Sequence, residues 1–157
     1  MKRCWTVLPF VPAMWFAVSA FEPVTRPATQ PPDGARIYAA TCQACHQASG
    51  LGLAPQFPPL AGSEWVTGSE ERLVLIILHG IVGEIEVEGE TFNGAMPTWG
   101  PTFKDEDLAA VATYVRGAFG NKAPPISVAT VARVRAAHAG RRNPWTVAEL
   151  QKALSGR

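Results

Sequence analysis

Five consecutive residues constrain this chain more than any other feature, and they read Cys42-Gln43-Ala44-Cys45-His46. Two thiols three positions apart lie on one face of a helix end, and an imidazole follows them directly. Cysteines in such an arrangement form a disulfide, bind a metal or attach a prosthetic group. The motif therefore predicts a site built on two thiols and one histidine at the end of the first helix.

The order Cys-x-x-Cys-His is the attachment signature of c-type haem. Thiols at this spacing can bond the two vinyl groups of one porphyrin, and the next residue places an imidazole beneath the iron. We therefore expect one covalent haem c, bound through Cys42 and Cys45, with His46 as an axial iron ligand. Attachment of this kind requires an exported, oxidising setting.

Three other interpretations of the cysteine pair are weaker. A thioredoxin-like redox pair follows a strand in a βαβ pattern, and no such pattern is visible here. A zinc site needs further ligands at suitable spacing, but residues 21–157 hold no third cysteine, and His79 and His138 stand 59 positions apart. A plain disulfide between Cys42 and Cys45 is the simplest alternative.

The sixth iron ligand is expected to be Met96, the only methionine in residues 21–157. It lies in Asn93-Gly94-Ala95-Met96-Pro97, where Gly94 allows close backbone approach and Pro97 stiffens the chain. We predict a loop at this point. His79, near the end of a predicted helix, is the rival ligand, and His138 is expected to be a solvated side chain.

The first twenty residues resemble a secretory signal. Lys2 and Arg3 precede an uncharged stretch that ends in Val18-Ser19-Ala20, a run of small residues suited to cleavage. An uncleaved membrane anchor stays an alternative, although two prolines interrupt the stretch and it is short for a spanning helix. No other segment is expected to cross a membrane, so we expect a periplasmic or otherwise exported protein.

The remaining chain is predicted to have three parts. A Pro-rich linker covers residues 21–32, a haem domain covers 33–120 and a basic helical tail covers 121–157. The expected fold is all-α, with three main helices around one haem, a small β-hairpin and a short helical tail. Periodicity predicts helices over 34–45, 70–79 and about 105–117, a hairpin over 84–92, a long loop over 47–63, and tail helices over 128–139 and to about 154. Four of these helices have an expected side-chain cap, namely Asp33, Ser69, Ser127 and Thr146.

Charge is distributed unevenly along the chain. Residues 21–120 hold five Lys or Arg against 12 Asp or Glu, and residues 121–157 hold seven against one. The tail either folds back on the acidic body or docks a partner. Since every motif residue precedes it, we expect deletion of 122–157 to leave haem attachment and methionine ligation intact. The net charge of +1 favours neither nucleic acid nor an anionic membrane as partner.

The segment from about Gly34 to Gly120 resembles the class I cytochromes c. Gly34 and Tyr38 precede the first haem cysteine by eight and four positions, which is the family's glycine-aromatic spacing. The resemblance implies that this pair packs against an aromatic residue of the last helix of the domain, here Tyr114. One departure is Lys104, where the family usually has a capping Ser or Thr; we expect a slightly weaker helix start there.

The loop Pro58-Pro59-Leu60-Ala61-Gly62 resembles the family's Pro-x-Leu-x-Gly loop. The resemblance implies that the Pro58 carbonyl accepts a hydrogen bond from the second ring nitrogen of His46, which fixes the ring and raises its basicity. The segments FPPLAGSEW and NGAMP are also similar to small single-haem cytochromes and to cytochrome domains fused to copper nitrite reductases.

These features predict an electron-transfer protein rather than an enzyme, because an iron that Met96 ligates is closed to substrate. The expected partners are redox proteins, such as a dehydrogenase, a reductase or an oxidase. Two alternatives stay open: a cytochrome subunit of a larger oxidoreductase complex, and a haem enzyme or gas sensor in which the sixth site opens.

Overall fold

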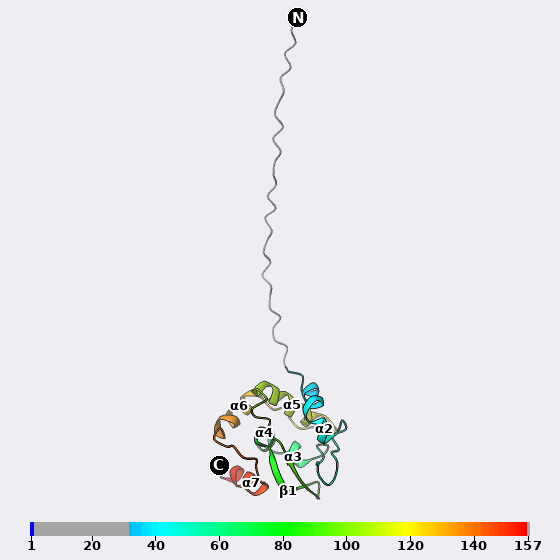
Figure 1. The fold of residues 1–157 in the computed structure, drawn as a ribbon, viewed down its shortest axis with the longest axis vertical. Helices are drawn as coiled ribbons and strands as arrows, with labels where there is room; N and C mark the ends of the chain where they lie inside the picture. The colour runs from blue at the N-terminus through cyan, green and yellow to red at the C-terminus, as the bar shows by residue number, and fades with distance from the viewer. Residues whose placement is uncertain (2–31, 157) are drawn as a thin grey trace. The chain divides into compact units, whose positions relative to one another are not determined.

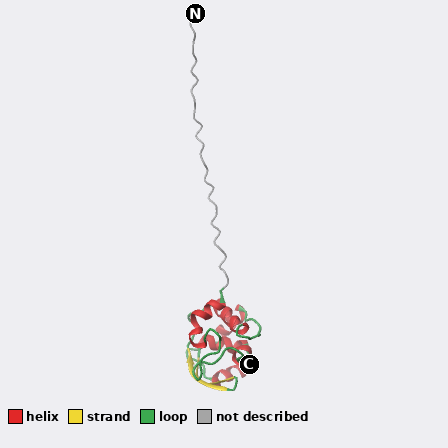
Figure 2. Ribbon diagram, turned by 90° about the vertical axis from the view of Figure 1, so that its right-hand side faces the viewer, coloured by secondary structure: helices red, strands yellow, loops and turns green. Residues whose placement is uncertain are grey.

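The computed structural model describes Met1 and residues 32–156. The predicted signal at 1–20 lies outside the described residues apart from Met1, and so does the linker at 21–32 apart from its last residue. Residues 32–156 form one folded unit, in which helices lie beside a two-stranded sheet at one edge (Figures 1 and 2).

Seven helices form within the described residues. They are α1 (Gly34–Thr41), α2 (Gln43–His46), α3 (Glu64–Thr67), α4 (Glu70–His79), α5 (Asp105–Gly117), α6 (Val128–Ala137) and α7 (Val147–Ser155). Four begin at a predicted side-chain cap that accepts hydrogen bonds from first-turn amides, namely Asp33, Ser69, Ser127 and Thr146. The predicted first helix is interrupted at Cys42, which ends α1 and begins α2.

The prediction of an all-α fold with three main helices is not confirmed. The tail helix α6 has 10 residues, as many as α4, and Val131 and Val134 on it are fully buried. The strands β1 (Ile81–Val87) and β2 (Glu90–Met96) add an antiparallel sheet of seven paired positions. The fold is therefore helical with a small two-stranded sheet.

The hairpin is longer than its predicted range of 84–92. Val87 is buried and Ile85 is half-buried, while the neighbouring glutamates are exposed, as the alternation predicts. Pairing continues to Ile81 and Met96, so Met96 is the last residue of β2 and the prediction of a loop there is wrong. The sequence pattern did not indicate the longer strands, because Gly83 and Gly94, which pair with each other, interrupt the period-two alternation.

The main helix crossing joins α1 and α5. A Cβ atom at Gly34 would lie 2.2 Å from the carbonyl oxygen of Ala110, so only glycine permits this approach. One turn further along, the rings of Tyr38 and Tyr114 are 5.5 Å apart. The packing implied by the family resemblance is present.

The basic tail packs into the same core. Its buried apolar side chains are Ile126, Val131, Val134, Trp145 and Leu150. Trp145 also adds backbone hydrogen bonds to the start of β1, donating to Gly80 and accepting from Val82. No helix within residues 32–156 is long and apolar enough to cross a membrane.

Candidate functional site

An apolar cavity lies between α2, the loop after it, α4 and the hairpin. Cys42, Cys45, His46 and Met96 all line it. Its empty volume is about 1200 Å³, counting the solvent at its open mouth. The other walls are mostly apolar and include Phe57, Pro59, Leu60, Trp65, Val66, Leu73, Ile76, Ile77, Ile81, Ile85, Val87, Pro97, Trp99, Val111 and Val115.

The last residue of α2, His46, is held in one ring orientation. Its Nδ1 donates to the carbonyl oxygen of Pro58 at 2.9 Å, the contact that the family resemblance implies. Burial lowers the pKa of His46, and the bond to Pro58 opposes this shift in part. A neutral ring that donates from Nδ1 keeps the Nε2 lone pair available to a metal.

The loop that carries Pro58 is tied to the rest of the fold. The amides of Leu60 and Ala61 donate to Gly50, at 2.7 and 3.0 Å. The buried Asn121 donates from Nδ2 to Leu60 at 2.9 Å and accepts at Oδ1 from Gly62 at 2.9 Å. Sequence reasoning missed Asn121, because its role depends on a contact across about sixty positions.

The two thiols lie one helical turn apart on the cavity wall. Burial raises the pKa of Cys42, and the Thr41 hydroxyl at 3.3 Å opposes this shift in part. Redox-active pairs use the opposite arrangement, in which the attacking thiol has a lowered pKa. The environment of Cys42 is therefore unlike that of a thioredoxin-type pair.

At the end of β2, Met96 lies half-buried against the core, with its side chain on the cavity wall. Two positions earlier, Gly94 lies so close to Gln56 that a Cβ atom would stand 2.7 Å from the Gln56 carbonyl oxygen. The hairpin thus brings Met96 to the same cavity as His46, from 50 positions further along the chain.

The rival ligand His79 does not line this cavity. Its ring lies 6.5 Å from that of His138 and 6.0 Å from that of Trp145, so it packs against the tail. Burial and the nearby Arg141 lower its pKa. Among the residues that the structure describes, no three His, Cys, Asp or Glu side chains gather as a metal site would require.

Comparison with known proteins agrees with this geometry. Residues 29–115 match the family described as cytochrome c oxidase, cbb3-type, subunit III. The chain belongs to the c-type cytochromes. Cytochrome c-552 of Thermus thermophilus is 44% identical to this cytochrome over 93 residues, which cover 57% of the chain and 70% of that protein.

Two further relatives are subunits of dehydrogenases. The cytochrome c subunit of a quinone-dependent alcohol dehydrogenase from Gluconacetobacter polyoxogenes is 35% identical over 105 residues, and the fructose dehydrogenase cytochrome subunit from Gluconobacter japonicus is 32% identical over 115. The matches cover 65% and 69% of this chain but only 22% and 23% of those subunits. Both are named as cytochrome subunits of dehydrogenases.

Cytochromes of this family carry covalent haem c and transfer electrons, and the cavity fits that group. Its walls are apolar, and both thiols of the attachment motif face it together with a neutral imidazole and a thioether. These are the side chains that covalent attachment and two axial bonds require.

Proposed function

We propose that this cytochrome is an exported one-electron carrier, with Cys42 and Cys45 bonded to the haem and His46 and Met96 as its axial ligands. The bound haem supplies a ferric–ferrous couple. The observation that carries the proposal is that these four side chains line one apolar cavity. The predicted parts of the chain then have distinct roles: 1–20 directs export, 21–32 links, 33–120 holds the haem and 121–157 packs against that domain.

The protein's contribution is to fix and enclose the iron ligands. Pro58 orients His46 and raises its basicity, and the surrounding apolar side chains exclude water. A thioether ligand raises the reduction potential relative to stronger donors. Because Met96 occupies the sixth position, substrate chemistry at the iron is disfavoured, so the protein serves as a carrier rather than an enzyme.

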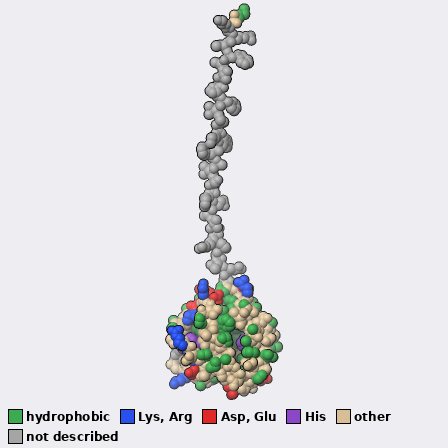
Figure 3. Space-filling model, viewed as in Figure 1, with side chains coloured by type: hydrophobic (Ala, Val, Ile, Leu, Met, Phe, Trp, Pro, Cys, Tyr) green, Lys and Arg blue, Asp and Glu red, His purple; other side chains and the backbone are tan. Residues whose placement is uncertain are grey.

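Electrons pass to redox protein partners near the ligand loops. Leu51 and Leu53, in the loop after α2, are 65% and 60% exposed, which suits a small, transient contact. On the face in Figure 3, hydrophobic side chains are spread over the surface, and Lys and Arg lie along the top and along the left edge, where α6 and α7 are. Charges of this kind steer encounter, so transfer rates should depend on ionic strength.

The test uses mature protein made with haem-attachment machinery. Colour should survive acid-acetone extraction, and the ferric protein should show the near-infrared band of methionine-to-iron charge transfer. Met96→Ala should abolish that band, and His79→Ala should retain it. Haem that extracts freely, or a band that depends on His79, contradicts the proposal.

A second candidate, a cytochrome subunit of a larger oxidoreductase, is favoured by the similarity to two dehydrogenase subunits. Purification from the native membranes and periplasm separates the two. A carrier elutes alone and exchanges electrons reversibly at an electrode, whereas a subunit elutes with a dehydrogenase in fixed stoichiometry.

A further inference from the structure

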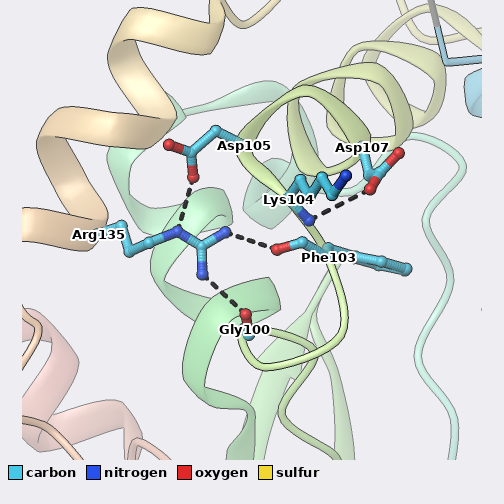
Figure 4. Close-up of polar contacts among 6 residues, drawn as sticks. All are labelled: Gly100, Phe103, Lys104, Asp105, Asp107 and Arg135. Carbon is cyan, nitrogen blue, oxygen red and sulfur yellow. Dashed lines mark hydrogen bonds and ion pairs between the residues drawn. The ribbon is translucent and has the colours of Figure 1, made fainter.

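One side chain of the tail reaches the segment that follows Met96. This segment, residues 97–104, joins β2 to α5. Arg135 on α6 donates from Nη1 to the carbonyl oxygen of Gly100 and from Nη2 to that of Phe103, both at 2.8 Å (Figure 4). Its Nε lies 2.6 Å from Oδ1 of Asp105, the first residue of α5. Two of its side-chain nitrogens thus hold this segment, and the third holds the residue that follows it.

The start of the same segment is attached to α4. The hydroxyl of Thr98 and the amide of Gly100 donate to Leu78, at 2.5 and 3.0 Å, and the amide of Trp99 donates to Ile77 at 3.0 Å. The segment is therefore held at its start by α4 and at its end by Arg135.

The turn between these attachments forms part of the cavity wall. Trp99 lines the cavity, and its ring stacks on Phe103 with centroids 5.3 Å apart and planes inclined by 12°. The amide of Phe103 donates to the carbonyl oxygen of Trp99 at 2.9 Å. The bonds of Arg135 to Gly100 and Phe103 therefore hold the turn that carries Trp99, and Trp99 lines the same cavity as Met96 three positions before it.

We propose that Arg135 is a positioning residue for Met96: by holding residues 100–105, it keeps the methionine sulfur on the iron. This inference rests on the proposed function, in which Met96 is the sixth ligand. It assigns to the tail a part in the haem site itself.

The chemistry of arginine suits this task. Its planar fork reaches two carbonyl oxygens and a carboxylate at once, which the single ammonium of lysine cannot do. Hydrogen bonds from a charged donor are stronger than neutral ones. The Arg135 side chain is 32% exposed and that of Asp105 is 27% exposed, so solvent weakens the ion pair but the two carbonyl bonds stay directional. Without them, the segment opens more readily than the rest of the fold.

The test measures how easily an added ligand displaces methionine. Ferric holoprotein is titrated with imidazole, and loss of the near-infrared methionine band is followed at a temperature far below unfolding. We expect Arg135→Ala to raise the affinity for imidazole about tenfold, which corresponds to about 1.4 kcal/mol. Arg135→Lys should fall between it and the wild type. The matched control is Arg133→Ala, which removes an exposed arginine from the same helix and should leave the affinity unchanged.

The outcomes separate this inference from the proposed function. A wild-type protein without the methionine band refutes the proposed function. A wild-type band together with equal imidazole affinities in the Arg135 and Arg133 variants refutes the inference alone. A lower unfolding temperature with unchanged imidazole affinity also refutes it, because it assigns Arg135 to stability only. Should Arg135→Ala yield no holoprotein, Arg135→Lys and Arg135→Gln decide by the same titration.

Discussion

Gly34, which has no side chain, allows the close approach of α1 and α5. At Gly34, a Cβ atom would lie 2.2 Å from the Ala110 carbonyl and 2.9 Å from the Tyr114 side chain, so neither helix can stay in place if one is added. We expect Gly34→Ala to cost about 2 kcal/mol or more of the free energy of unfolding, as overpacking does.

Denaturant unfolding of the holoprotein measures this cost. The control is Gly117→Ala, at the end of α5, where an added Cβ atom meets nothing within 4 Å. That change should be neutral or slightly stabilising, because alanine favours the helix. Equal destabilisation by the two variants would contradict the packing argument.

The hydroxyl of Tyr38 links α1 to Gln47, the residue after His46. It donates to the carbonyl oxygen of Gln47 at 2.6 Å, and Gln47 adopts a left-handed backbone with φ of 61°. Burial raises the pKa of Tyr38 from 10.0 to about 12. Between these two pKa values the unfolded chain loses the phenolic proton while the folded chain keeps it. The contribution of Tyr38 to the free energy of unfolding is therefore complete below pH 10 and falls as pH rises toward 12.

This linkage gives a prediction for alkaline pH. Tyr38→Phe should lower stability by about 1 kcal/mol at neutral pH, through loss of the hydrogen bond. It should also remove about 1 kcal/mol of the decline between pH 8 and 11, because pH 11 lies only halfway between the two pKa values. Denaturant unfolding at pH 8 and 11 measures both effects, with Tyr114→Phe as the control that keeps the decline. An unchanged decline in Tyr38→Phe would show that another group titrates.

At the scale of elements, the starts of helices could be predicted from local chemistry. The strand and turn that carry the chain past the cavity after β1 could not. Asp33, Ser69, Ser127 and Thr146 each cap a helix as predicted, because a cap is a contact within three residues. The short helix α3 was not predicted: it lies between the predicted loop over 47–63 and the predicted helix over 70–79, and its four residues give too little periodicity.

The hairpin shows why local patterns were insufficient. Its last pair, Ile81 and Met96, depends on the whole register rather than on either strand alone. The four residues proposed to hold the haem could be named from the motif and from the scarcity of methionine. The cavity that these four side chains share could not be predicted. The roles of Asn121 and Arg135 could not be predicted either, because both side chains bind carbonyl oxygens far away in the sequence.

The turn between the strands yields a prediction at this scale. Glu88 and Gly89 have positive φ values of 51° and 80°, the type I′ geometry that asparagine and glycine favour. Glu88→Asn should therefore stabilise the protein, and Gly89→Ala should cost about 1 kcal/mol through backbone strain alone, because its Cβ atom would meet nothing.

Thermal unfolding followed by circular dichroism measures these effects. Glu88→Gln removes the same charge as Glu88→Asn but has no preference for the left-handed region, so it should leave stability near that of the wild type. If the glutamine and asparagine variants gain equally, charge rather than turn geometry is responsible.

At the scale of the whole molecule, the tail belongs to the fold. Seven basic residues against one acidic residue left folding back and partner docking as alternatives. The structure shows the first of them: α6 packs on α4 and α5, Trp145 extends β1, and Arg135 pairs with Asp105. The expectation that deletion of 122–157 would spare the haem domain followed from the position of the motifs and ignored the buried apolar residues of the tail.

The buried residues reverse that expectation. Ile126, Val131, Val134, Trp145 and Leu150 are each at most 4% exposed. At about 2 kcal/mol for each buried side chain, their loss amounts to about 10 kcal/mol, which is comparable with the entire stability of a small domain. We therefore expect deletion of 122–157 to abolish the yield of folded holoprotein, as measured by haem absorbance per cell.

A single substitution tests the same point with less disruption. Trp145→Ala should lower the free energy of unfolding by about 3 kcal/mol or more, because it empties a site that is 3% exposed between the tail and β1. Val128→Ala is the control, since Val128 begins α6 but is 42% exposed and should change stability little. If both variants match the wild type and the truncated chain attaches haem normally, the tail packs on the domain without supporting it, and its basic residues are then free to serve a partner.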